Sequence, residues 1–184
     1  LVPIFRHTQQ IKLIYHGRAS EHRNLENIIR AVSQFPKKYS LDLMVGTKGT
    51  DYTRTKHIRE LAATYANVNI LEQVPYDQII KQLQSYDMGI HLLPDTCFNH
   101  RHALPNKIFE YIQARLGLIV TPLPEICKLV ESHGVGVVTD GETADDCIVA
   151  LERIQLEDVS RYKEASHKAS LILNAEISHE KLVN

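Results

Sequence analysis

The chain has 184 residues, of which 43% are hydrophobic and 23% are charged, and its formal net charge is −1. This length is enough for one domain with a sizeable core and too short for two comfortable ones. The near-neutral charge argues against a nucleic-acid-binding arm or a polybasic membrane anchor, and no apolar run approaches the roughly 18 residues of a membrane span.

The first residues are predicted to be a linker stub, residues 1–10. The chain begins Leu1-Val2-Pro3-Ile4 rather than with methionine, which is typical of a cut made inside a longer protein. We therefore expect an N-terminal domain that this chain lacks.

From residue 11 onward, short apolar runs alternate with amphipathic stretches. Strands are predicted at 11–16, 41–45, 68–71, 88–92, 118–121 and 136–139. Helices are predicted at 25–35, 53–65, 76–84, 107–114, 126–132 and 143–154. This alternation predicts an α/β domain over residues 11–157: a Rossmann-like, mostly parallel six-stranded sheet with helices on both faces. Residues 158–184 are predicted to form a C-terminal helical tail.

A sheet of this kind binds ligands outside the carboxyl ends of its strands, near the point where strand order reverses. The loops at that edge are 17–24, 46–52, 72–76, 93–106 and 121–125. Helix starts at 104–107 and 123–126 fall in two of them. Because a helix N-terminus presents unpaired backbone N–H groups, both starts are suited to a phosphate.

The loop after the first strand carries Gly17, Arg18 and Arg23. Glycine lets the chain turn sharply off the strand, and two guanidinium groups could clamp a diphosphate and neutralise a leaving nucleotide. The alternative is that both arginines are solvated surface residues. Asn24 is predicted to cap the helix that follows.

Two other loops hold weaker candidates. Gly46 closes the second strand and permits either a close backbone approach to a ligand or a plain turn. Val74 could offer backbone groups to a nucleobase edge, although an ordinary strand-to-helix connection explains it as well.

A cation and a carboxylate, Lys107 and Glu110, lie in the first turns of the predicted helix at 107–114. A carboxylate among apolar neighbours is costly to bury without partners, so Glu110 should face a polar cleft, where a ribose diol is a suitable donor. The alternative is an exposed glutamate paired with Lys107 one turn earlier.

The sequence lacks the motifs that are typical of metal sites and of several other enzyme classes. The pair His100-x-His102 invites a metal interpretation, but no HExxH motif and no compact set of His, Cys and Asp supports it, so no metal is predicted. The chain also lacks G-x-S-x-G, Walker A and G-x-G-x-x-G motifs. Their absence weakens hydrolase, NTPase and dinucleotide oxidoreductase interpretations.

An ordered set of short motifs carries a family resemblance over about residues 11–155. In chain order they are Gly17-Arg18 with Arg23, Gly46, Tyr86-Asp87-Met88-Gly89-Ile90, Pro105-Asn106-Lys107-Ile108-Phe109-Glu110-Tyr111 and Pro122-Leu123-Pro124-Glu125. With this set the chain resembles the C-terminal, nucleotide-sugar-binding domain of GT-B glycosyltransferases, specifically the large retaining family GT4. The predicted domain would then be one half of a GT-B fold.

The resemblance implies roles for individual residues. Arg18 and Arg23 would hold the diphosphate, and Glu110, the second glutamate of an E-x7-E motif, would bind the ribose. The first glutamate of that motif falls on His102, which is a departure from the family pattern. The implied catalytic residues are Arg18, Arg23 and Glu110, and the implied donor-binding residues are Gly17, Gly46, Val74, His102, Leu104, Asn106, Lys107 and Glu110.

The resemblance also implies an activity: retaining transfer of a sugar from a nucleoside diphosphate sugar, with UDP as a candidate nucleotide, to an acceptor. It implies neither a metal nor another cofactor, and it places the acceptor site in the missing N-terminal domain, so that the isolated chain would be inactive. Because enzymes of this family usually act in polysaccharide or glycan biosynthesis, the resemblance suggests the same role in the cytoplasm, including at the inner face of the membrane. Any membrane contact would come through the full-length protein, and no nucleic-acid partner is implied.

Two other interpretations remain open. The first is a UDP-sugar 2-epimerase-like enzyme, which would interconvert UDP-sugars without an acceptor. The second is a catalytically degenerate GT-B-like binding module, which His102 and the altered Ala114-Arg115-Leu116-Gly117 segment suggest.

Overall fold

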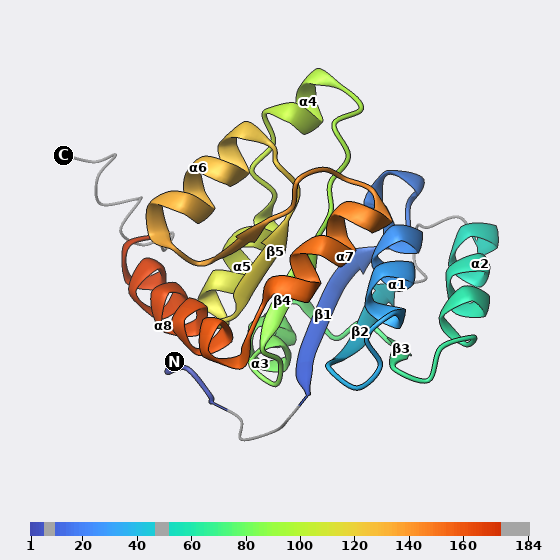
Figure 1. Ribbon diagram of the computed structural model, residues 1–184, viewed down its shortest axis with the longest axis horizontal. Coiled ribbons are helices and arrows are strands. Elements are labelled where there is room, and N and C mark those ends of the chain that lie inside the picture. The colour runs from blue at the N-terminus through green and yellow to red at the C-terminus, as the bar shows by residue number, and fades with distance from the viewer. Residues whose placement is uncertain (6–9, 47–51, 174–184) are drawn as a thin grey trace.

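The computed structural model describes residues 1–5, 10–46 and 52–173. Part of the predicted linker, 6–9, most of the predicted loop at 46–52, and the end of the predicted helical tail, 174–184, lie outside the described residues. The described residues form a six-stranded sheet covered by helices on both faces, which confirms the predicted α/β architecture (Figure 1).

All strands of the sheet run parallel, in the order β3-β2-β1-β4-β5-β6. They are β1 (Ile11–Arg18), β2 (Tyr39–Gly46), β3 (Val68–Leu71), β4 (Met88–His91), β5 (Gly117–Val120) and β6 (Gly136–Val138). Strand β1 pairs with β2 from Ile11 opposite Tyr39 to Arg18 opposite Gly46. These two strands therefore end side by side at the carboxyl edge.

The helices divide between the two faces of the sheet. One face packs against α1 (Leu25–Ser33), α2 (Tyr52–Ala62) and α7 (Ala144–Arg153). The other face packs against α3 (Ile79–Leu83), α5 (Asn106–Gln113) and α6 (Pro124–His133). The chain moves outward from β1 to β3 and then in the opposite direction from β4 to β6. Right-handed crossovers therefore place the connecting helices of the two halves on opposite faces.

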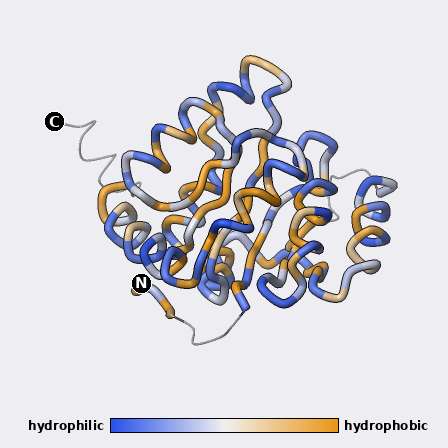
Figure 2. Tube along the Cα trace, viewed as in Figure 1, coloured by the Kyte–Doolittle hydropathy of each residue, from blue (hydrophilic) through white to orange (hydrophobic). Residues whose placement is uncertain are grey.

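Each face has its own apolar core, built by helices with one buried stripe. In α1 the predicted stripe of Leu25, Ile28, Ile29 and Val32 is fully buried. In Figure 2 the helical turns alternate between hydrophobic and hydrophilic colours, while the central strands are mainly hydrophobic. This pattern is expected of a sheet that is covered on both faces.

The C-terminal helix α8 (Leu156–Ile172) packs against α5, α6 and β5. Its Lys163 is only 2% exposed, and the Nζ atom donates a hydrogen bond to the Tyr86 carbonyl at 2.7 Å and lies 3.7 Å from Asp87 Oδ1. Because a buried ammonium needs such partners, this contact fixes where α8 crosses the domain. Within the part of the chain described, none of the helices has the length and hydrophobicity needed to cross a bilayer.

The structure differs from the predicted elements most clearly in three places, and several other helices and strands begin or end one to three residues from their predicted bounds. Strand β1 continues through Gly17 and Arg18, because both residues still pair with β2. The single helix predicted at 76–84 is divided into a short 3-10 turn, η2 (Tyr76–Gln78), and α3. The predicted loop at 93–106 contains α4 (Phe98–Arg101), which is too short to show a helical period in the sequence.

Candidate functional site

The strand order reverses between β1 and β4, and several candidate residues lie at the carboxyl end of these two strands. Strand β1 ends at Gly17 and Arg18, and β4 ends at His91. A short 3-10 turn, η1 (Glu21–Arg23), follows β1, and α5 begins at Asn106. The structure therefore brings the loop after β1 and the first turn of α5 to the edge where open α/β sheets bind ligands.

Lys107 lies directly over Gly17. A Cβ atom added at Gly17, whose φ is +131°, would lie 2.5 Å from Lys107 Nζ. The ammonium donates a hydrogen bond to Tyr15 Oη at 3.1 Å and sits 4.6 Å from the centre of the Tyr15 ring. Tyr15 Oη in turn donates to the Arg18 carbonyl at 3.0 Å. The missing side chain at Gly17 thus makes room for a lysine held across the end of β1.

Lys107 and Arg23 lie close enough to repel each other, and the nearby Glu110 carboxylate offsets this repulsion only in part. Burial, together with repulsion from Arg23, lowers the pKa of Lys107 to about 7, although the nearby Glu110 carboxylate acts in the opposite direction. Within the described residues, the buried Nε atom of Arg23 has no hydrogen-bond partner. Unpaired buried donors and a desolvated lysine are costly to the folded protein and favourable to an anion. The site is therefore electrostatically suited to a diphosphate.

Glu110 faces the end of β1 from α5. Its Oε2 atom lies 3.1 Å from Nε2 of His16, and the two side chains are 15% and 7% exposed. The alternative pairing of Glu110 with Lys107 was wrong, because Lys107 reaches Tyr15 and the basic neighbour of Glu110 is His16. His16 was not among the predicted site residues. Its signal in the sequence is a polar residue at the end of an apolar strand.

His91 is a second histidine that the sequence did not single out. It is fully buried, and neither ring nitrogen has a hydrogen-bond partner among the described residues. Burial and the charges of Lys107 and Arg23 hold the pKa of His91 well below its usual range, so the ring is neutral at pH 7. A neutral ring adds no further positive charge behind Lys107.

Gly46 and Val74 lie next to Gln73, which joins the ends of β1 and β2. Gly46 is buried, and the Gln73 side chain occupies the space that a Cβ atom there would need. Gln73 Nε2 donates to the Gly17 carbonyl at 3.2 Å. The side chain of Val74 packs against the core of the α5 face, so what it offers at the edge is its backbone.

The remaining predicted residues are exposed. Arg18 lies exposed at the end of β1, and His102, Leu104 and Asn106 are exposed around the connection from α4 to α5. The His102 ring packs against the ring of Phe98, which is also exposed, with the ring centres 4.4 Å apart. His102 therefore lies exposed at the carboxyl edge of the sheet, and its ring contacts Phe98.

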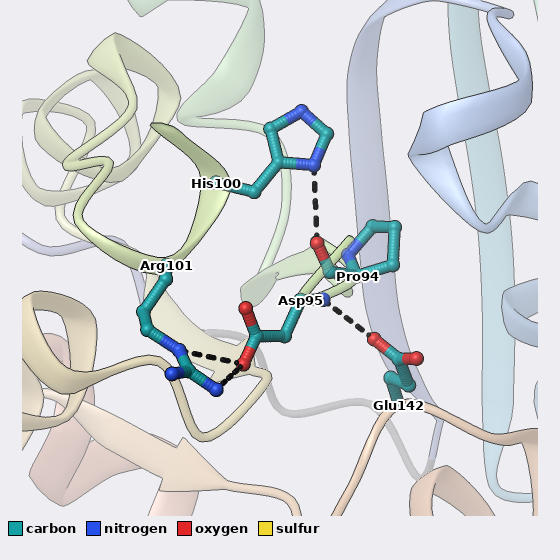
Figure 3. A network of polar contacts seen from close by, with 5 residues as sticks. All are labelled: Pro94, Asp95, His100, Arg101 and Glu142. Carbon is teal, nitrogen blue, oxygen red and sulfur yellow. Dashed lines mark hydrogen bonds and ion pairs between the residues drawn. The ribbon is translucent and has the colours of Figure 1, made fainter. Parts of the chain in front are cut away.

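A network of polar contacts fixes the loop that precedes α5 (Figure 3). Arg101 donates to Asp95 Oδ2 through Nε at 3.0 Å and Nη2 at 2.7 Å. His100 Nδ1 lies 3.1 Å from the Pro94 carbonyl, and the Asp95 backbone N–H donates to Glu142 Oε2 at 2.8 Å. The segment that carries His102 is therefore held to a residue far away in the sequence.

Glu142 also holds the start of α1. Its carbonyl accepts hydrogen bonds from the side-chain amides of Asn24 and Asn27. Asn24 is the N-cap residue of α1, as predicted, and its carbonyl accepts a hydrogen bond from the Ile28 amide. Its side chain caps no backbone amide, because Asn24 has left-handed backbone geometry (φ 54°) and its side-chain amide bonds to Glu142 instead. Glu142 thus links the loop of Arg23 to the loop of His102.

A Glu142→Ala variant should release the 94–102 loop with little effect on the rest of the fold. The variant loses the acceptor for the Asp95 amide and keeps the carbonyl bonds to Asn24 and Asn27. We expect the Asp95 amide to exchange roughly 5- to 10-fold faster, the effect of one lost hydrogen bond, while amides of β1 keep their rates. Hydrogen exchange measured residue by residue checks this, with Glu142→Gln, which keeps an acceptor oxygen, as the control. Unchanged exchange at Asp95 in the alanine variant would contradict the assignment.

The described residues contain no group of three or more His, Cys, Asp or Glu side chains that could hold a metal ion. In the His100-x-His102 pair, the two rings have different partners. His100 Nδ1 lies 2.9 Å from Thr96 Oγ1, and His102 packs on Phe98.

Comparison with known proteins identifies the scaffold. The chain resembles a glycosyltransferase from Rickettsia africae ESF-5 with a TM-score of 0.76 and 12% identity over 96% of this chain and 47% of that one. It also resembles the C-terminal domain of a glycosyl transferase group 1 family protein, LpcC, from Francisella tularensis, with a TM-score of 0.70, 9% identity, and coverage of 94% and 87%. A third match is trehalose-6-phosphate synthase, with a TM-score of 0.64, 12% identity, and coverage of 89% and 42%.

These matches agree in fold with one half of a GT-B glycosyltransferase. The chain spans less than half the length of the Rickettsia africae glycosyltransferase and of trehalose-6-phosphate synthase. No similar sequence was found among curated proteins. The model of the family described as glycosyl transferases group 1 matches residues 3–170. Since that match covers most of the chain and the fold agrees, the chain belongs to the glycosyl transferases group 1 family.

Proposed function

We propose that this chain is the donor-binding domain of a GT4-type glycosyltransferase, which transfers a sugar with retention from a nucleoside diphosphate sugar to an acceptor. The observation that carries the proposal is the position of Lys107 over Gly17, close to the Glu110 carboxylate and to Arg23, whose Nε atom has no hydrogen-bond partner in the described part of the chain. Cations suit the diphosphate, and a carboxylate suits the ribose hydroxyl groups. One edge of the sheet therefore offers suitable groups for both the diphosphate and the ribose of a nucleotide.

The same groups can stabilise the leaving nucleotide. As the sugar departs, negative charge develops on the diphosphate, and under this proposal Lys107, Arg23 and the N-terminal amides of α5 would face it. Donors that are held in place before the reaction need little reorganisation, which is the main source of electrostatic catalysis. Lys107 is pinned to Tyr15 and Arg23 is partly buried, so both meet this condition.

The acceptor side belongs to the part of the enzyme that we propose lies N-terminal to this chain. The chain is similar to a C-terminal domain in LpcC, and trehalose-6-phosphate synthase, another match, is described as transferring sugars with retention. By analogy, the isolated chain should bind the donor and transfer little or no sugar. We extend the proposal to polysaccharide or glycan biosynthesis in the cytoplasm, where any membrane contact would be made by the full-length protein.

Calorimetric titration with UDP, GDP and ADP tests the donor-binding proposal. We expect saturable binding of one nucleotide, with UDP the first candidate, and roughly 10-fold or greater weakening in Glu110→Ala, since a charge-assisted hydrogen bond to the ribose is lost. Glu131→Ala, which removes an exposed carboxylate from α6, is the matched control and should bind normally.

The other outcomes each favour a different function. If neither the chain nor the full-length protein binds any nucleotide, the donor-binding proposal fails and a degenerate binding module is favoured. If UDP-sugars are interconverted without an acceptor, an epimerase is favoured instead.

A further inference from the structure

His16 occupies a fixed position between β1 and α5. Side chains alternate along a strand, so Tyr15 packs in the core on the α1 face while His16 lies on the opposite face with Ile14. His16 is 5% exposed. Its imidazole is therefore a buried polar group at the end of an otherwise apolar strand.

Tyr111 holds His16 from the α5 side. The two rings meet edge to face with their centres 5.2 Å apart, and the backbone N–H of His16 donates to Tyr111 Oη at 3.3 Å. Tyr111 itself is fully buried and lies against Gly89 of β4, in the space that a side chain there would fill. A ring wedged in this way leaves the His16 imidazole little rotational freedom.

The free edge of this ring faces Glu110. Nε2 of His16 lies 3.1 Å from Glu110 Oε2, and a carboxylate can only accept, so Nε2 carries the proton in this contact. Within the described residues, Nε2 is buried and its N–H makes no aligned hydrogen bond. A small rotation of the Glu110 side chain would complete one, leaving the second carboxylate oxygen for another donor.

We propose that His16 is a positioning residue that orients the Glu110 carboxylate toward the ribose hydroxyl groups of a bound nucleotide. This inference rests on the proposed function, because it concerns the same site. A glutamate on a helix has several rotamers, and fixing it before binding removes part of the entropic cost of recognising the ribose. The imidazole does not touch the ligand itself. It acts through Glu110.

Two variants separate the hydrogen-bonding role from simple packing. His16→Phe keeps a ring that can meet Tyr111 edge to face but removes the N–H that faces Glu110. His16→Gln loses the ring, while its amide nitrogen can reach about the position of Nε2 and still donate. A purely structural residue should be replaced better by phenylalanine, and a positioning residue should be replaced better by glutamine.

The readout is the preference for a ribonucleotide over its 2′-deoxy counterpart, with UDP and 2′-deoxy-UDP as the first pair. We expect the wild-type chain to bind UDP about 10-fold more tightly than 2′-deoxy-UDP, since one hydrogen bond to a carboxylate is lost. In His16→Phe this preference should fall to about 2-fold or less, through weaker UDP binding alone. In His16→Gln most of the preference should return, and adding Glu110→Ala to His16→Phe should cause little further loss.

Several results would overturn the inference, and they differ from failure of the proposed function. If Glu110→Ala removes the preference and His16→Phe does not, His16 has no positioning role. Equal weakening of both nucleotides in both His16 variants, with lowered melting temperatures, would assign His16 a structural role. Absence of binding by the wild-type chain and the full-length protein to any nucleotide would remove the proposed function and this inference with it.

Discussion

Replacing Lys107 by methionine should weaken nucleotide binding by about one to two orders of magnitude and at the same time stabilise the domain. The Lys107 ammonium is desolvated beside Arg23, so its pKa is held at about 7, and a charged group in this position opposes folding. Methionine keeps the apolar stem, and Tyr15 Oη keeps its own bond to the Arg18 carbonyl. We expect about 10- to 100-fold weaker nucleotide binding and on the order of 1 kcal/mol greater free energy of unfolding at pH 6.

Calorimetry and thermal unfolding measure the two effects separately. The folded-state pKa of Lys107 lies below the unfolded value, so the unfolded chain binds an extra proton above about pH 7 and the wild type gains stability as the pH rises. The advantage of the methionine variant should therefore be larger at pH 6 than at pH 8.5. Lys128→Met, at an exposed position on α6, is the control and should change neither property. A methionine variant that binds nucleotide normally would remove Lys107 from the site.

Nucleotide binding should weaken as the pH rises above about 7. The free site holds Lys107 with a pKa of about 7, and a bound diphosphate favours the charged ammonium and raises that pKa. Binding then takes up a proton, and the affinity should fall by up to about 10-fold per pH unit between about pH 7.5 and 9. Titration in buffers with different ionisation enthalpies measures the proton uptake directly.

A Lys107→Arg variant provides the control for this pH dependence. Arginine stays charged throughout this range, so the variant should bind with an affinity that is nearly independent of pH between 7.5 and 9. A wild-type affinity that is equally flat would contradict the lowered pKa of Lys107 in the free protein.

The edge of the sheet that carries the proposed site could be predicted from the sequence, but the contacts of its side chains could not. The apolar strands and the proline-punctuated start of α5 place Gly17, Lys107 and Glu110 at one edge, because carboxyl ends of parallel strands share an edge. The contact between Lys107 and Tyr15 joins residues 92 positions apart. No local spacing encodes such a contact, which depends on how α5 crosses the sheet.

The histidines show the same division. A helical or strand period reports which side of an element faces the core, so His16 and His91 are read from the sequence as polar interruptions of apolar strands. That His16 meets Glu110, and that neither ring nitrogen of His91 finds a hydrogen-bond partner among the described residues, depends on what the neighbouring elements place opposite them. Glu142 was missed for a related reason, since it lies in the loop before α7 and acts on loops that precede it by 47 residues or more.

The sequence by itself determined the α/β class, the edge of the sheet at which the site is proposed, and the membership in a glycosyltransferase family. These properties follow from periodicity, turn residues and motif order, all of which are local along the chain. Only the tertiary structure decided that Lys107 lies over Gly17, that Glu110 pairs with His16 rather than Lys107, and that Glu142 ties two loops together. Each of these contacts is set by the packing of helices across a twisted sheet, which brings together residues that the sequence keeps far apart.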